Sequence, residues 1–198
     1  MWLEAEKEGL FTIGFERVTS PWKPADDAVL TALIAASERR KPISVLYLSL
    51  RRRTPVRRTI CPHTIVDADG RLHVRAFDYA RRRFADFLVT RINEVDGDES
   101  AAWIDKAADV EWHEFVDVAV APKPEMSLEQ AQAAMKDVGL PPEGGTIRTR
   151  RALAFYLVRT LRLSNLEVPD TGKRYVCKNL REVAEWVGVD AQGDSAEV

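Results

Sequence analysis

Five short segments of strand-forming residues follow one another between residues 43 and 92, and this spacing constrains the fold more than any other feature of the chain. They cover residues 43–50, 56–61, 64–67, 71–77 and 84–92. Asp69-Gly70, between the third and fourth segments, is typical of a tight hairpin turn. Five short strands at this spacing predict a small β-barrel.

An amphipathic helix is expected just before the first strand. Pro24 and the acidic pair Asp26-Asp27 are typical of a helix start, because negative charge is favourable at the positive end of the helix dipole. Basic residues then close the helix before Pro42. Between these ends, apolar side chains recur at helical spacing, at Val29, Leu30, Leu33 and Ile34.

The second half of the chain changes character. Residues 112–120 alternate as a strand that keeps Trp112 on its apolar side and turns His113 to the surface. Ser127 and Gln130 form a capping box for a helix that ends near Val138. A helix over 151–163, a strand over 174–178 and a last helix over 180–187 complete a β-α-α-β-α order, and the tail from Asp190 is expected to fray.

These elements predict an α+β chain of 198 residues in three parts. An N-terminal helical segment covers 1–39, the barrel covers 40–96, and a small α+β domain covers 107–189. Both domains are small, which suits the size of core that a chain of this length can bury.

Positive charge is concentrated in one segment of an otherwise acidic chain. Residues 51–91 contain eleven arginines and four aspartates, whereas the whole chain has a formal charge of −2. The barrel therefore creates a positive field, which favours an anionic partner.

Polar side chains of the barrel strands share faces and predict an anion pocket. In the segment 71–77, period-2 geometry puts Arg71, His73, Arg75 and Phe77 on one side and Leu72, Val74 and Ala76 on the other. Tyr47 and Ser49 share a face, as do Phe87, Val89 and Arg91. Arginine binds phosphate through fixed bidentate donors, and histidine is a donor that can charge near neutral pH.

A plainer interpretation stays open for each of these residues. For any single arginine, a solvated face that forms salt bridges to the acidic remainder of the chain is the favoured interpretation. His63, after Pro62, is as consistent with a hydrogen-bonded turn as with a site residue. Tyr156 and Trp186 lie on apolar helical faces and are expected in the core.

Several classes of protein are not supported by the sequence. The only two cysteines, Cys61 and Cys177, lack the spacing of a disulfide framework or a zinc site, so we expect no metal and no cofactor. No signal peptide or membrane span is present, which favours a cytoplasmic protein. The motifs of hydrolases, nucleotide-binding loops and metalloproteases are also missing, and we expect no enzyme activity. A nuclease that uses His63 and His73 as acid and base is a remote alternative.

Four segments of the first half resemble the WYL domain of bacterial transcriptional regulators. They are Ile-Ser-Val-Leu-Tyr-Leu-Ser at 43–49, Arg-Thr-Ile-Cys-Pro-His-Thr-Ile-Val at 58–66, Gly-Arg-Leu-His-Val-Arg-Ala-Phe at 70–77 and Phe-Ala-Asp-Phe-Leu-Val-Thr-Arg-Ile at 84–92. The Pro-His, His-x-Arg-Ala and Asp-Phe-x-x-x-Arg-Ile pieces are similar to repressors associated with phage defence, of the CapW and BrxR kind. The second half resembles their carboxy-terminal dimerisation domain through Trp112, 122–124, 150–157 and 178–180, so the resemblance covers about residues 25–182.

This resemblance implies a fold, a site and partners. The fold would be an Sm-like or SH3-like barrel followed by a dimerisation domain, in a homodimer. The ligand would be a nucleotide or a short nucleic acid, and DNA would be bound only by an amino-terminal winged helix. The residues that would line the pocket are Tyr47, Ser49, Arg58, His63, His73, Arg75 and Arg91.

The chain departs from the family in two places. Leu72-His73-Val74 replaces the Trp-Tyr-Leu triplet that names the family, as is usual in the phage-defence subgroup, so the ligand cannot be transferred from the wider family. Residues 1–24 are too short for a winged helix. We therefore consider a truncated regulator, a stand-alone sensor, and a barrel that binds single-stranded nucleic acid directly through Phe77, Tyr79, Phe84 or Phe87.

Overall fold

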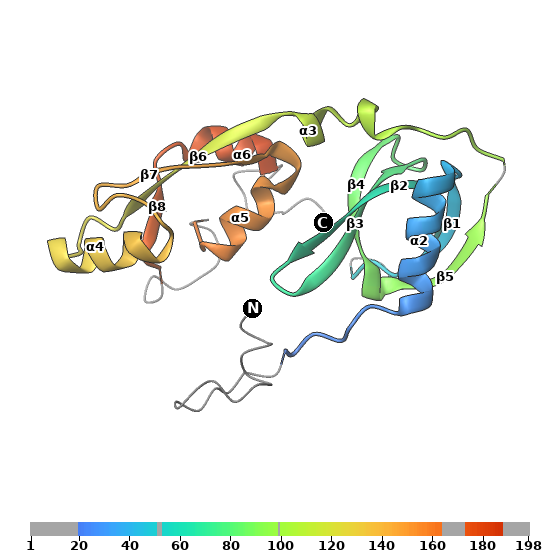
Figure 1. The fold of residues 1–198 in the computed structure, drawn as a ribbon, viewed down its shortest axis with the longest axis horizontal. Helices are drawn as coiled ribbons and strands as arrows, with labels where there is room; N and C mark the ends of the chain where they lie inside the picture. The colour runs from blue at the N-terminus through green and yellow to red at the C-terminus, as the bar shows by residue number, and fades with distance from the viewer. Residues whose placement is uncertain (1–19, 51–52, 99, 164–172, 188–198) are drawn as a thin grey trace, which may run out of the picture.

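The computed structural model describes residues 20–50, 53–98, 100–163 and 173–187, which form two antiparallel sheets with helices packed against them (Figure 1). The larger sheet has the strand order β4-β3-β2-β1-β5 and the smaller one the order β7-β6-β8. The strands of the larger sheet are β1 (Ile43–Tyr47), β2 (Val56–Ala68), β3 (Arg71–Asp78), β4 (Arg83–Leu88) and β5 (Ile92–Gly97). The α+β class predicted from the sequence is confirmed.

Two of the predicted strands are one strand in the structure. The segments 56–61 and 64–67 form the single strand β2, whose pairing with β3 shifts register between Pro62 and Thr64. The extra residue at this β-bulge is His63. A proline cannot donate to the ladder, so the interruption in the sequence pattern marks a bulge rather than the end of a strand.

The strand predicted over 84–92 is instead β4, followed by the short 3₁₀ helix η1 (Val89–Arg91) and the start of β5. β5 is mostly exposed and carries few apolar residues, so its pattern did not predict a strand. Its existence depends on pairing with β1 rather than on its own composition.

The closed Sm-like or SH3-like barrel is not confirmed. β4 and β5 are the two end strands of the sheet order, and no ladder joins them within the part of the chain that the structure describes. The physical reason is η1, which redirects the chain within three residues so that β5 pairs with β1 instead of with β4. The sheet is therefore open.

The predicted N-terminal helix is confirmed as α2 (Asp27–Arg39) and completes the core of the larger sheet (Figure 1). The side chain of Asp26 caps it by accepting from Ala28 N at 2.8 Å. At the other end, Arg40 adopts a left-handed conformation with φ 52°. The apolar face packs on the strands, and the buried cluster includes Val29, Leu33, Ala36, Val45, Ile60, Val74 and Phe87.

The smaller sheet consists of β6 (Phe115–Pro122), β7 (Gly145–Arg150) and β8 (Tyr175–Cys177). Its core is covered by α4 (Leu128–Asp137), α5 (Ala154–Thr160) and α6 (Leu180–Val187), and η3 (Arg151–Leu153) precedes α5. The capping box of Ser127 and Gln130 is confirmed. Trp186 packs against this core cluster, as predicted, but remains partly exposed.

One strand of this sheet was not predicted. β7 follows a turn at Gly144, where φ is +105° and a Cβ atom would lie only 2.6 Å from the carbonyl oxygen of Val120, so the turn requires glycine. The Gly144-Gly145 pair therefore marks the start of a strand as well as a turn. The order becomes β-α-β-α-β-α instead of the predicted β-α-α-β-α.

The segment 112–120 begins as a helix, which corrects the predicted strand. Lys106–Ala108 form the 3₁₀ helix η2, and Val110–His113 form the short helix α3. Asp109 caps α3, so Trp112 and His113 belong to the helix and the strand begins at Phe115. Trp112 is buried and His113 exposed, as predicted.

Two expectations concern other parts of the chain. The tail from Asp190 lies outside the described residues. None of the helices in the described ranges is both long and apolar enough to span a membrane.

Candidate functional site

The larger sheet with α2 forms a first unit of the chain, and the smaller sheet with α4, α5 and α6 forms a second unit. A cavity of about 290 Å³ lies between the larger sheet and α5 of the second unit. Five of the seven residues predicted for the pocket line it: Tyr47, Ser49, Arg58, His73 and Arg91. Further lining residues, which the predicted set omitted, include Trp22, Arg71, Asp86, Tyr156 and Arg159. The cavity is thus built by both units of the chain.

Three arginines concentrate positive charge at this cavity. Arg71 lies on β3, Arg91 in η1 and Arg159 on α5. None of them forms an ion pair with a carboxylate of residues 20–50, 53–98, 100–163 or 173–187. Burial lowers the pKa of Arg71, and the positive charges of Arg91 and Arg159 lower it further, which places the three groups within electrostatic reach of one another.

Arg58 lines the same cavity but its charge is already neutralised. Its Nη1 atom lies 3.2 Å from Oδ2 of Asp78, and both side chains are buried. A buried ion pair stabilises only while both partners are present. Arg58 therefore belongs to the wall of the cavity, and Asp78 holds it in place.

His73 is a hydrogen-bond acceptor in this cavity rather than a cation. Its Nδ1 lies 3.1 Å from the carbonyl oxygen of Arg71, which can only accept, so Nδ1 carries the proton. Burial lowers the pKa of His73 to about 4, helped by the charges of nearby arginines including Arg91. The ring is neutral near pH 7 and its Nε2 is left as an acceptor, which corrects the expectation of a donor that charges at neutral pH.

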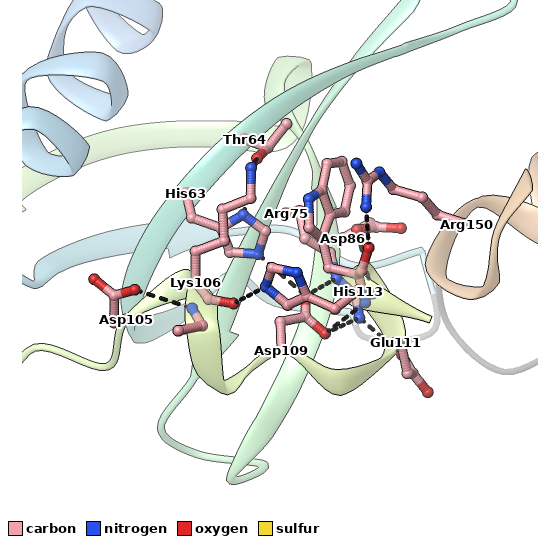
Figure 2. Close-up of polar contacts among 12 residues, drawn as sticks. His63, Thr64, Arg75, Asp86, Asp105, Lys106, Asp109, Glu111, His113 and Arg150 are labelled. Atoms are coloured by element: carbon pink, nitrogen blue, oxygen red, sulfur yellow. Dashed lines mark hydrogen bonds and ion pairs between the residues drawn. The ribbon is translucent and has the colours of Figure 1, made fainter. Parts of the chain in front are cut away.

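The other two predicted residues, His63 and Arg75, do not line the cavity but meet at a buried carboxylate (Figure 2). Arg75 donates to Asp109 through Nε at 2.8 Å and Nη2 at 3.0 Å, and its Nη2 also donates to Glu111 at 2.7 Å. His63 Nε2 lies 3.1 Å from Asp109, and its Nδ1 lies 2.9 Å from Thr64 Oγ1. These contacts attach β2 and β3 to the segment that connects the two units.

Hydrogen bonds keep the carboxylate of Asp109 charged in this network. Burial alone would raise its pKa, but the hydrogen bonds from His63 and Arg75 outweigh burial and hold the pKa well below its usual range. The carboxylates of Asp109, Asp86 and Glu111 keep the pKa of Arg75 above its ordinary value, although burial lowers it. Arg75 is therefore a charged side chain paired with carboxylates inside the structure.

Asp86 connects this network to the cavity. Its side chain is 4% exposed and lines the cavity. Tyr156 OH donates to Oδ2 at 3.1 Å, whereas Oδ1 has no hydrogen-bond partner among the described residues and lies 3.5 Å from Arg75 Nη1. Burial raises the pKa of Asp86 to about 6, although Arg75 and Tyr156 lower it.

Of the cavity residues that the sequence prediction omitted, some carried a recognisable signal in the sequence and others carried none. Arg71 lies two residues before His73, so period-2 geometry had already put it on the same strand face. Trp22 and Arg159 carry no local signal, because they reach the cavity from outside the barrel segment. Tyr156 was expected in the core but is half-buried at the cavity wall, where its ring lies 5.0 Å from that of His73.

The geometry gives no support to the nuclease alternative. His63 contacts Asp109 and the ring of Trp112, whereas His73 lies at the cavity, so the two histidines occupy different surroundings. Cys61 is buried, and burial raises the pKa of its thiol, which disfavours a nucleophilic thiolate. In the described ranges no group of three or more His, Cys, Asp and Glu side chains is suited to hold a metal ion.

The aromatic residues considered for direct binding of single strands are largely engaged with one another. Phe77 packs edge-on against Tyr79 and Phe84, with ring centroids 5.3 Å apart in both pairs. Phe87 is buried and lies against Tyr47. Stacking of successive bases needs exposed ring faces, and Phe77, Tyr79 and Phe84 are only partly exposed.

Comparison with known families agrees with this two-part architecture. Residues 28–96 match the WYL domain, and residues 115–183 match the C-terminal dimerization domain of the BrxR transcriptional regulator. The first half of the chain is therefore similar to a WYL domain and the second half to a BrxR-type dimerization domain, which is consistent with a WYL regulator. The finer domain boundaries expected from the sequence stay predictions.

The chain is similar over most of its length to curated repressors named CapW. A DNA-binding transcriptional repressor CapW of Stenotrophomonas maltophilia is 29% identical over 89% of this chain and 60% of its own length. CapW of Escherichia coli (strain KTE188) is 26% identical over 72% of this chain and 47% of its length, and CapW of Pseudomonas aeruginosa is 35% identical over 62% and 40%. The chain thus spans between 40% and 60% of these relatives.

Two solved structures show a more distant likeness. Proteasome accessory factor B/C (PafBC) of Arthrobacter aurescens aligns with 84% of this chain and 27% of its own, at 14% identity and a TM-score of 0.39. A CRISPR Cas-related protein aligns with 79% of this chain and 47% of its own, at 10% identity and a TM-score of 0.41.

Proposed function

We propose that this chain is the ligand-sensing and dimerising portion of a WYL-domain transcriptional repressor associated with phage defence. A nucleotide or a phosphate ligand derived from nucleic acid binds in the basic cavity and controls DNA binding. DNA itself is contacted by a winged-helix part of the regulator. The observation that supports the proposal is the group of Arg71, Arg91 and Arg159, three guanidinium groups at one cavity that have no carboxylate partner among the described residues.

The position of the cavity suggests how a ligand acts on the rest of the regulator. Arg71 and Arg91 belong to the WYL sheet, whereas Arg159 belongs to α5 of the dimerization domain. An anion held by all three bridges the two units and offsets the repulsion among the arginines. It therefore favours the arrangement in which the units are close, and this bias is the coupling that an allosteric regulator needs.

Replacing Arg91 with alanine is expected to weaken ligand binding by about 10- to 100-fold, because hydrogen bonds to charged groups contribute about 1.5–3 kcal/mol. The measurement is fluorescence anisotropy with labelled single-stranded oligonucleotides and competing mononucleotides at two salt concentrations. Wild-type affinity should fall with salt, since phosphate contacts release counterions.

The matched control is Arg148→Ala, because Arg148 is exposed on β7, lies over the ring of Phe115 and does not line the cavity. It should bind like the wild type. Equal loss of binding in both variants would show that net charge, and not the cavity, holds the ligand.

We expect the chain to form a homodimer through residues 115–183, which match the dimerization domain. Light scattering coupled to size-exclusion chromatography should give a mass about twice that of one chain at micromolar concentration. A mass equal to one chain across the accessible concentrations would contradict this part of the proposal.

A further inference from the structure

The charged side chains that line the basic cavity do not cancel one another. Five arginines and three aspartates line it, and His73 is neutral near pH 7, so the wall carries a net charge of +2. Like charges gathered around one small space repel, and this repulsion disfavours the empty cavity. The ligand that neutralises the wall therefore brings about two negative charges.

The lining aspartates are engaged by other side chains. Asp78 lies 3.2 Å from Arg58, and Asp69 accepts from Thr160 Oγ1 at 3.0 Å. Asp86 accepts from a tyrosine hydroxyl of α5 at 3.1 Å. The lining arginines of β3, η1 and α5 are thus left without an ion pair to any carboxylate of the described residues.

An aromatic ring covers one face of one of these arginines. The guanidinium carbon of Arg71 lies 4.6 Å from the centroid of the Trp22 ring, and both side chains line the cavity. Stacking occupies the flat face of a guanidinium group and leaves its in-plane N–H groups for hydrogen bonds. These N–H groups form a fork of two parallel donors, which matches a pair of oxygens on one phosphorus atom.

Three such forks distinguish a terminal phosphate from a phosphate inside a nucleic-acid strand. A phosphomonoester has three unesterified oxygens, which make three oxygen pairs, and it carries a charge of about −1.5 to −2 at pH 7. A phosphodiester has two unesterified oxygens, which make a single pair, and it carries one negative charge. The charge of the wall and the number of its unpaired arginines therefore both favour the monoester.

The size of the cavity agrees with a single terminal group. Its volume of about 290 Å³ is close to the lower end of ligand pockets, which begins at about 300 Å³. Two phosphodiesters would also supply two negative charges, but a sugar separates them, and together they need a longer groove. The space fits one nucleotide unit.

We propose that the cavity selects a terminal phosphomonoester over the phosphodiesters inside a strand, with Arg71, Arg91 and Arg159 each binding a pair of its oxygens. The monoester belongs either to a free mononucleotide or to the phosphorylated end of a strand. This inference rests on the proposed function, because it specifies the ligand of the same cavity. Hydrolysis of a phosphodiester adds water and yields one phosphomonoester and one hydroxyl, so the regulator responds to cleaved rather than intact nucleic acid.

The test compares oligothymidylates of one length that carry a 5′-phosphate, a 3′-phosphate or hydroxyl groups at both ends, by calorimetry on the full chain. Wild type should bind at least one phosphorylated strand about 10-fold or more tightly than the hydroxyl strand, the effect of one hydrogen bond to a charged group. Thymidine 5′-monophosphate distinguishes the two sources. Affinity equal to that of the phosphorylated strand indicates a free nucleotide, and weaker affinity indicates the end of a strand.

Arg91→Lys separates the donor fork from its charge. Lysine keeps the positive charge but is a point charge without the planar fork. The variant should lose about 10-fold in affinity for the phosphorylated strand and bind the hydroxyl strand as the wild type does. Arg148→Ala, the control outside the cavity, should keep the full preference. The comparison of strands on wild type needs no variant and stands even if a substitution impairs folding.

Two results overturn the inference in different ways. If wild type binds phosphorylated and hydroxyl strands equally and Arg91→Ala loses both, the proposed function stands and the selection of a terminal phosphate is wrong. If neither thymidine 5′-monophosphate nor any of the strands binds, both proposals fail.

Discussion

Asp109→Ala is expected to lower the free energy of unfolding by about 3–5 kcal/mol, because it leaves Arg75 buried beside an incomplete set of carboxylates. The wild-type carboxylate accepts from Arg75 at 2.8 and 3.0 Å and contacts His63 at 3.1 Å. It also caps α3 through the backbone N–H of Trp112 at 3.3 Å. All three contacts are lost together, and they join β2, β3 and the connecting segment (Figure 2).

Urea unfolding followed by circular dichroism gives this quantity, provided that the slope of the free energy against denaturant is compared as well. Arg57→Ala is the matched control. Arg57 pairs with Glu94 and Asp96 at 2.6 Å, but these side chains are all exposed, so its loss should leave the urea midpoint almost unchanged. Similar midpoints for the two variants would contradict the central role given to the buried network.

Asp86→Asn is expected to change how stability depends on pH, by an amount on the order of 2–3 kcal/mol between pH 7 and pH 4. Burial raises the pKa of Asp86 to about 6 in the folded protein, above the ordinary aspartate value of 3.8. The groups that face it are Arg75 from β3, Tyr156 from α5 and Asp109 from the connecting segment.

The direction follows from proton uptake. Between pH 6 and pH 4 the folded state binds a proton at Asp86 that the unfolded state does not yet bind, so falling pH stabilises the folded protein through this group. Asparagine cannot titrate, and the variant lacks this contribution. Relative to Asp86→Asn, the wild type should therefore gain stability as the pH falls from about 7 to about 4.

Urea midpoints of both proteins at several pH values measure this difference, and other titrating groups cancel in the comparison. A wild type that loses stability relative to Asp86→Asn on acidification would mean that Arg75 dominates over burial and keeps the pKa of Asp86 low.

Local signals account for the elements that were predicted correctly. The cap at Asp26, the capping box at Ser127 and the helical spacing of apolar residues in α2 involve neighbours along the chain, so the sequence is enough to place them. β5 and β7 were missed for the opposite reason. They are edge strands, mostly exposed in β5 and without a buried residue in β7, and their pairing with β1 and β6 provides the stability that their composition does not.

The sequence predicted a basic cavity but only some of the residues that line it. Tyr47, Ser49, Arg58, His73 and Arg91 were expected there and line it. The two-residue period of strand faces applies to Tyr47, Arg58 and His73, whereas Ser49 follows β1 and Arg91 lies in η1. The same period also predicted Arg75 at the cavity, because Arg75 lies two residues after His73 on the same strand. In the structure the Arg75 side chain instead donates to Asp109 and Glu111, and a strand pattern contains no information about these distant carboxylates.

The sequence by itself determined the α+β class, the first helix and the concentration of arginine on a small sheet, since these depend on residue type and short-range spacing. Only the tertiary structure decided which arginines are neutralised and which face the cavity. Asp109 lies 34 residues from Arg75, which it neutralises, and 46 residues from His63, which it contacts. Arg159, by contrast, comes from α5 and lines the same cavity as Arg71 and Arg91. Charge follows from composition, but its neutralisation depends on which distant carboxylates the fold brings within a few ångströms.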